Sequence, residues 1–74
     1  MITEHEIIVL VKDIPEKGLV EGDVGTVVHV YSNEKAYEVE FVTAEGETIA
    51  VLTLEENDIR SIKNKEILHV RSLI

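Results

Sequence analysis

The sequence predicts a single, small, mainly β domain. Three observations indicate this class: a length of 74 residues, several runs rich in valine and isoleucine, and polar turns with glycine or proline between those runs. A chain of this length can form one hydrophobic core but not two. It has no cysteine and only three histidines, so disulfides cannot stabilise it and association with another chain is expected.

The first expected strand covers residues 7–11, a β-branched apolar run that is too short for a stable helix. Its unbroken apolar character predicts burial on both faces. A polar loop follows over residues 12–23, where one proline and two glycines favour turns. Leu19 and Val20 lie together in this loop, and we expect both to pack on the core.

The second expected strand covers residues 23–31 and has valine at four positions. Gly25 lies near its start, where the missing side chain permits a β-bulge or the close approach of another strand. A polar turn over residues 32–35 then leads to the third strand.

The third expected strand, residues 36–42, shows a strict alternation of apolar and acidic side chains. Glu38 and Glu40 occupy one face of it, and the opposite face is apolar, formed by Tyr37, Val39 and Phe41. The alternation predicts one solvent-exposed face and one buried face. A glycine-containing hairpin at residues 44–46 should then join this strand to an antiparallel fourth strand over residues 47–52.

The pattern changes at Thr53, which has the spacing of a capping box with Glu56. This spacing predicts a single helical turn that ends at Asn57. A fifth short strand over residues 58–62 would follow and return Ile59 and Ile62 to the core, completing the expected elements of the domain.

Five short strands, a long loop after the first and one turn before the last predict a five-stranded SH3-like barrel rather than a β-sandwich, which needs more strands. We assign the barrel to residues 1–62 and a C-terminal extension to residues 63–74. The extension has five aliphatic residues in twelve, at spacings that fit a helix as well as a strand. It is too apolar for a solvated tail, so it should pack on the barrel, on a second copy or on a partner.

Charge is strongly negative and unevenly distributed. The chain has 15 acidic and seven basic side chains and a net charge of −8. Residues 1–58 hold 14 acids and three bases (−11), whereas residues 59–74 hold one acid and four bases (+3). The overall excess of acidic side chains repels phosphate backbones, so nucleic-acid binding is not expected. A protein partner with a basic surface is favoured instead.

The first residues carry Glu4 and Glu6 where a secretory signal would have basic residues, and the absence of cysteine is typical of a reducing compartment. We therefore expect a cytoplasmic protein. The longest apolar run, residues 7–11, falls far short of the ~20 residues that span a bilayer, so no membrane association is expected.

The residues that usually carry chemistry are scattered. The three histidines (His5, His29 and His69) lack metal-ligand spacing with carboxylates, the serines have no neighbouring base, and the glycines lack the lysine of a phosphate-binding loop. Glu38 and Glu40, about 7 Å apart on one strand face, have the spacing of an acid and base pair. An exposed strand face that discourages aggregation is the preferred interpretation. No enzyme activity, metal or cofactor is therefore expected.

The same two carboxylates could form an acidic docking strip. Tyr31 ends the second expected strand, beside the turn, and is the kind of aromatic side chain that anchors protein interfaces. The aliphatic residues of the extension could instead complete a neighbour's barrel. The candidate partner-binding residues are therefore Tyr31, Glu38, Glu40, Ile67, Val70 and Ile74.

The segment KDIPEKGLVEGDVGTVVHVY at residues 12–31, followed by AYEVEF and IAVLTLEENDIR, resembles a family of small uncharacterised bacterial proteins grouped as a domain of unknown function. The resemblance covers residues 6–62. It implies an SH3-type barrel and, because such proteins are sometimes encoded beside suspected toxins, a role as an antitoxin or immunity protein. A shorter similarity, to the ribosomal KOW motif, lies in Gly25, Val27 and Val30 and implies an RNA contact.

Overall fold

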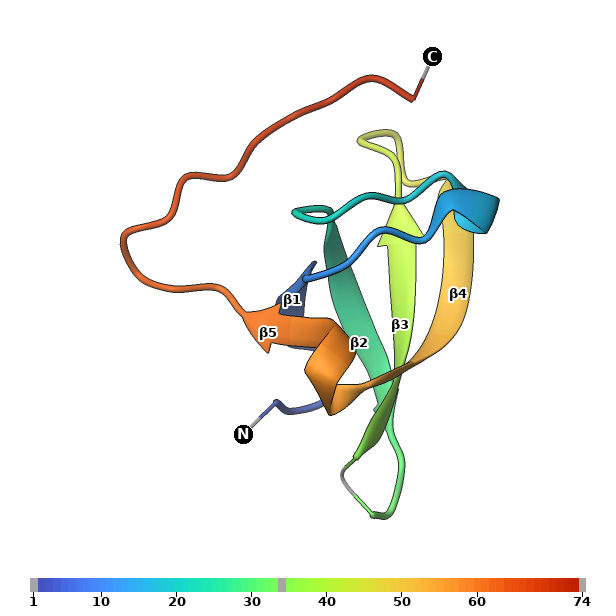
Figure 1. Cartoon of the computed structure of the whole chain (residues 1–74), viewed down its shortest axis with the longest axis vertical. Coiled ribbons are helices and arrows are strands. Elements are labelled where there is room, and N and C mark those ends of the chain that lie inside the picture. The colour runs from blue at the N-terminus through green and yellow to red at the C-terminus, as the bar shows by residue number, and fades with distance from the viewer. Residues whose placement is uncertain (1, 34, 74) are drawn as a thin grey trace.

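The computed structural model describes residues 2–33 and 35–73 and shows a mainly β chain. Five antiparallel strands form a single sheet in the order β4-β3-β2-β1-β5 (Figure 1). Two single-turn 3-10 helices interrupt the connections. The elements are β1 (Ile7–Leu10), η1 (Pro15–Lys17), β2 (Val24–Val30), β3 (Ala36–Val42), β4 (Thr48–Glu55), η2 (Glu56–Asp58) and β5 (Ile59–Ser61). Within the described ranges, no helix is long and apolar enough to cross a membrane.

The sheet is open, which corrects the prediction of a closed barrel. Strands β4 and β5 are its two edges, and no ladder joins them in the described part of the chain. Figure 1 shows β5 running across the long strands β2 and β3 rather than parallel to them, so the sheet is strongly bent. The bend encloses a core without hydrogen bonds between the edge strands.

Strand β3 supplies the centre of the core. Tyr37, Val39 and Phe41 are all buried, and the acidic residues between them face outward, which confirms the predicted alternation. Strand β3 pairs with β4 over its whole length and in the predicted antiparallel direction. The other residues of the core cluster are Ile8, Leu10, Ile14, Leu19, Val27, Leu54 and Ile59.

The prediction that the first strand is buried on both faces is confirmed only in part. Ile8, Val9 and Leu10 are buried, but Ile7 is 50% exposed, which corrects the prediction for this residue. Ile7 pairs with Thr26 of β2 at the edge of the outer face, where nothing in the described chain covers it. An apolar run alone does not reveal which of its residues lies at the rim of the sheet.

The loop between β1 and β2 contributes Leu19 to the core and leaves Val20 39% exposed, so the prediction is confirmed for the first residue and wrong for the second. Leu19 exchanges backbone hydrogen bonds with Ile14, which holds it against the core. Adjacent residues in an extended pair point to opposite sides, so Val20 faces solvent. Its amide donates a hydrogen bond to the Asp23 carboxylate, which closes the turn before β2.

Gly25 allows the rings and methyl groups of β3 to lie directly on the backbone of β2. A Cβ atom at this position would lie 2.8 Å from side-chain atoms of both Phe41 and Val39. Close approach is therefore the correct interpretation of this glycine. The bulge of β2 lies further along, between Val27 and His29.

Strand β4 is longer than predicted and includes Thr53. The helical turn is present, but it begins two residues later than the predicted capping box of Thr53 and Glu56. Asp58 performs the capping role, because its carboxylate accepts a hydrogen bond from the Glu55 amide at 2.9 Å. Pairing with β3 extends β4 through the predicted helix start, since the ladder satisfies the backbone there.

The chain after β5 forms neither a helix nor a strand as far as residue 73. Ile59 is buried as predicted, whereas Ile62 lies beyond the end of β5 and is only half-buried. We call residues 62–73 the tail. In Figure 1 the tail, coloured orange to red, arcs away from β5 and returns toward the hairpin between β3 and β4.

We predict that Gly25→Ala destabilises the fold by about 1–3 kcal/mol, because its new methyl group must displace Phe41 or Val39 from a close-packed position. Urea unfolding followed by circular dichroism measures this change. Thr26→Ala, at the neighbouring, half-buried position, is the control and should change stability by less than about 0.5 kcal/mol. If Gly25→Ala and Thr26→Ala lowered the stability equally, a methyl group at position 25 would not clash with Phe41 or Val39.

Candidate functional site

The outer face of the sheet carries a group of polar side chains around two carboxylates. Glu38 and Glu40 project from β3 on the face opposite to the core and are half-buried. We call them, with Tyr31, Thr48 and Thr53, the acidic strip. Antiparallel pairing creates this group, because it places Thr53 directly opposite Glu38 and brings the start of β4 beside Glu40.

Two hydroxyl groups orient the carboxylate of Glu38. Thr53 Oγ1 donates to Glu38 Oε1 at 2.6 Å, and Tyr31 Oη donates to the same oxygen at 3.0 Å. The second oxygen, Oε2, receives no hydrogen bond from the described residues and faces outward with the strip. The carboxylate is thus held in position while half of its acceptor capacity stays available.

Glu40 is arranged in the same way. Thr48 Oγ1 donates to Glu40 Oε2 at 2.8 Å, and Oε1 has no donor among the residues that the structure describes. None of the ion pairs within residues 2–33 and 35–73 involves Glu38 or Glu40. Two oriented carboxylates on one strand therefore carry charge that no basic side chain of the described chain neutralises.

Apolar and aromatic side chains border the strip. The rings of His29 and Tyr31 meet edge to face, with centroids 4.8 Å apart and planes at 87°. The aliphatic residues exposed on the sheet near the carboxylates are Val28, Val42 and Val51. Aromatic side chains, exposed aliphatic groups and unneutralised charge on a flat face are the chemistry of a protein interface.

The structure brings together three of the six residues proposed from sequence, namely Tyr31, Glu38 and Glu40. Sequence reasoning missed Thr48, Thr53 and His29. Thr53 was assigned to a helix start, yet the apolar alternation continues past it through buried Leu54 to exposed Glu55, and that signal could have placed it on the outer face.

The other proposed residues lie elsewhere. Ile67 and Val70 are in the tail and are 92% and 90% exposed. Ile74 lies outside the described residues. The tail contacts the chain near the start of β2, whereas Tyr31 follows the end of that strand, so the tail and the acidic strip are separate features.

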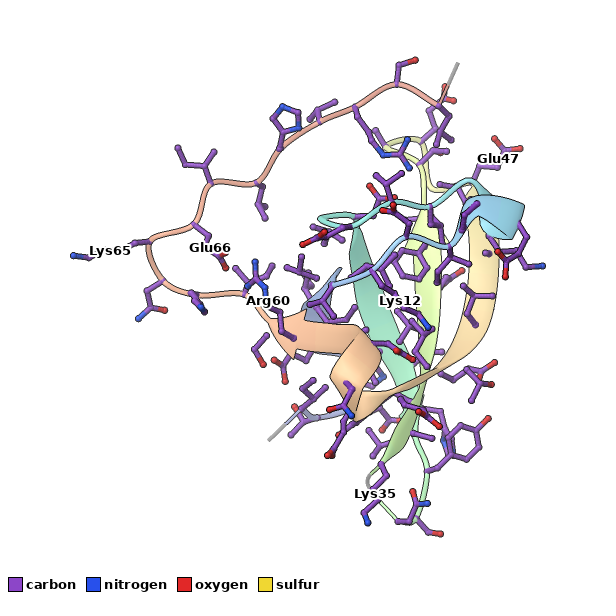
Figure 2. All side chains as sticks on the ribbon, viewed as in Figure 1. Lys12, Lys35, Glu47, Arg60, Lys65 and Glu66 are labelled. Carbon is purple, nitrogen blue, oxygen red and sulfur yellow. The ribbon has the colours of Figure 1, made fainter. Side chains whose placement is uncertain are left out.

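Two ion pairs attach the tail to the sheet. The first joins both guanidinium nitrogens of Arg60 to the Glu66 carboxylate at 2.6 and 2.8 Å. Glu66 also accepts a hydrogen bond from the Lys63 amide, and these contacts lower its pKa to about 2. Figure 2 shows Glu66 directed back toward Arg60, while Lys65 points away into solvent.

The second ion pair lies at the far end of the tail. Arg71 donates two hydrogen bonds to the Asp23 carboxylate, at 2.6 and 2.7 Å, and a third to the Gly18 carbonyl at 2.9 Å. The guanidinium of Arg71 lowers the pKa of Asp23. Bidentate pairing of this kind fixes the orientation of an arginine as well as its position.

Side chains suited to a metal ion are not gathered in residues 2–33 and 35–73. That part of the chain has no cluster of three or more histidine, aspartate or glutamate side chains that could hold one. The hydroxyl groups of the acidic strip all donate hydrogen bonds to the carboxylates of Glu38 and Glu40.

These features define a small antiparallel β-sheet domain with an acidic outer face. The chain belongs to the family described as Domain of unknown function (DUF4926), which matches residues 4–61. The match ends at the last residue of β5, so the tail lies beyond it. Neither the curated proteins nor the solved structures contain a match to this chain.

We predict that acid breaks both ion pairs that attach the tail. The pKa values of Asp23 and Glu66 are lowered in the folded chain, so the stabilisation from both pairs is present near pH 7 and is lost as the pH falls through the lowered values. The Arg60 pair should persist to about pH 2, where Glu66 protonates. An NMR titration that follows the Nε–H signals of Arg60 and Arg71 measures the loss of both pairs.

Asp23→Asn is the matched control, because it removes the charge but keeps an acceptor for the Val20 amide. It should abolish the acid transition of the Arg71 signal and leave that of Arg60 in place. An Arg71 signal that titrates identically in this variant would contradict the assignment.

Proposed function

We propose that this chain is a non-enzymatic protein-binding domain that recognises a basic surface of another protein through its acidic strip. One observation carries the proposal: Glu38 and Glu40 are oriented by hydroxyl donors yet neutralised by none of the described basic side chains. A lysine or arginine of a partner would complete the hydrogen bonding of both carboxylates. The net charge of −8 would speed its approach.

A role as an antitoxin or immunity protein fits this chemistry. Proteins that cleave or bind nucleic acids carry basic surfaces, because those surfaces must contact phosphates. A small acidic domain that covers such a surface would block access of the nucleic acid. The exposed Val28 and Val51 beside the carboxylates would add apolar contact area to the complex.

We also propose that the bent sheet is of the SH3-like type. Five short antiparallel strands, the long loop between β1 and β2 and the 3-10 turn before β5 support this assignment. The cytoplasmic location and the KOW-like RNA contact remain predictions. The body that would contact RNA, residues 1–58, has only three basic side chains, so we do not favour the second of these.

The test is capture of a partner from the native host by the full chain and by Glu38→Gln/Glu40→Gln. The wild type should retain one specific basic protein, and the double variant should bind that protein at least about tenfold more weakly, because two charge-assisted contacts are lost. Titration calorimetry with the purified partner measures the affinity.

The matched control is Glu45→Gln/Glu47→Gln, which removes two exposed acidic charges from the hairpin between β3 and β4, where Figure 2 labels Glu47, and leaves both carboxylates of the acidic strip in place. This variant should keep an affinity within about twofold of the wild type. Equal losses in both double variants would mean that net charge, rather than the acidic strip, determines binding. No bound protein at all would reject the proposal.

The exposure of Ile67 and Val70 favours a second candidate function, that of a homo-oligomeric accessory subunit. Aliphatic side chains that are about nine-tenths exposed keep nearly all of their apolar surface in water and would gain free energy by packing on a neighbouring copy. In this case the tail would form the shared contact.

We predict for this candidate that sedimentation of the full chain shows a dimer or larger species and that Ile67→Ser/Val70→Ser converts it to a monomer. The variant loses only apolar tail contacts, so circular dichroism should show an unchanged sheet. A monomeric wild type at high concentration would remove this candidate.

A further inference from the structure

A groove lies between the tail and the end of the sheet where β2 begins. Its volume is about 310 Å³, and its lining combines apolar side chains of the sheet with residues 69–71 and 73 of the tail. The apolar residues of the sheet and loop that line it are Leu19, Val24, Phe41, Val42 and Ile49. A space of this size can accept side chains of an extended peptide.

The rim of the groove has acceptors arranged for a guanidinium group. Asp23 presents both carboxylate oxygens and Gly18 its carbonyl, and all three accept hydrogen bonds from Arg71. The loop itself holds these acceptors: the Val20 amide donates to Asp23 Oδ2, and the Gly18 amide donates to the Pro15 carbonyl. Their positions therefore do not depend on the arginine that is bound there.

The tail makes hydrogen bonds at the rim of the groove but packs poorly against its apolar lining. Arg71 makes every contact that the rim offers, yet the neighbouring Val70 is 90% exposed and Leu73 is 53% exposed. Their side chains therefore bury little surface, and Val24 and Val42 of the groove lining stay 37% and 46% exposed. The tail uses the arginine site and leaves the apolar part of the groove unfilled.

We propose that this groove is a second binding site, which takes an extended segment of a partner protein carrying an arginine beside bulky apolar residues. In the free chain Arg71 occupies the arginine position as a tethered competitor. The chemistry of the occupant is read from the tail itself, and the negative charge of residues 1–58 favours a basic segment. The proposal shares the class of partner with the proposed function. The groove and the acidic strip are distinct but neighbouring, because Val42 of the groove pairs with Thr48 of the strip.

The tether makes the competition substantial. About ten residues connect β5 to Arg71, and a flexible linker of this length produces a millimolar effective concentration of the tethered group. A partner segment whose arginine only replaces the contacts of Arg71 would seldom displace the tail. A segment whose apolar side chains also cover Val24 and Val42 would displace it.

The experiment measures binding of a fluorescently labelled synthetic peptide, ILHVRSLI, to the full chain by fluorescence anisotropy. We expect Arg71→Ala in the protein to strengthen binding of this peptide about tenfold, because the competitor is gone. A peptide with phenylalanine in place of its second leucine should bind more tightly still, because the larger side chain can cover more of the exposed Val24 and Val42.

The controls separate this site from the acidic strip. Adding Asp23→Asn to the Arg71→Ala protein should abolish binding, and a peptide with alanine in place of its arginine should not bind. Adding Glu38→Gln/Glu40→Gln should leave the affinity for the peptide unchanged. Failure of the proposal for the acidic strip can therefore be distinguished from failure of the proposal for the groove. Circular dichroism verifies that each variant is folded.

Three results would overturn the proposal. One is equal peptide affinity for wild type and Arg71→Ala, and another is absence of binding to Arg71→Ala at millimolar peptide. The third is a wild-type dimer in sedimentation that Asp23→Asn dissociates, because that result would assign the site to the tail of a second copy.

Discussion

The packing of Phe41 and Val39 onto the backbone of β2 at Gly25 is the contact on which the rest of the structure depends. A single sheet has no second layer to cover its apolar face, so it must bend until that face is enclosed. The missing side chain at Gly25 leaves room for the side chains of Phe41 and Val39 to pack directly on the β2 backbone inside this bend. Leu19 and Ile14 of the loop then close the open side of the core.

The same bend decides what lies outside. With the apolar side chains of β3 turned inward, Glu38 and Glu40 must face solvent, and pairing with β4 brings threonine hydroxyls to them. The hydroxyls orient the carboxylates without removing their charge. This arrangement suits the proposed basic partner, because the carboxylates that would receive its cation are already oriented.

The uneven charge along the chain has a structural counterpart. Arg60 and Arg71 pair with Glu66 and Asp23, so two of the four basic residues after position 58 serve to attach the tail. These pairs are partly exposed, and exposed pairs stabilise weakly. The tail is therefore attached by contacts that each contribute little to stability.

How well each element could be predicted depends on whether neighbouring residues in the sequence or contacts with other strands determine it. Alternation in residues 36–42 is local, and it predicted β3 and its two faces correctly. The spacing of Thr53 and Glu56 is also local, but pairing with β3 outweighed it and extended β4 through Thr53. Ile7, Val20 and Ile62 were expected to be buried because they are apolar, yet each lies at an edge or just beyond an element, which hydropathy does not register.

By itself, the sequence determined the β class, the number of strands and their succession along the chain, the acidic body and the basic end, because these depend on side-chain periodicity and charge along the chain. Only the tertiary structure decided that the sheet stays open, that Tyr31 and Thr53 share one oxygen of Glu38, and that Arg71 reaches Asp23. Arg71 and Asp23 are 48 residues apart, and no local pattern encodes such a contact. It forms only once the bent sheet and its loop have placed an acceptor within reach of the tail.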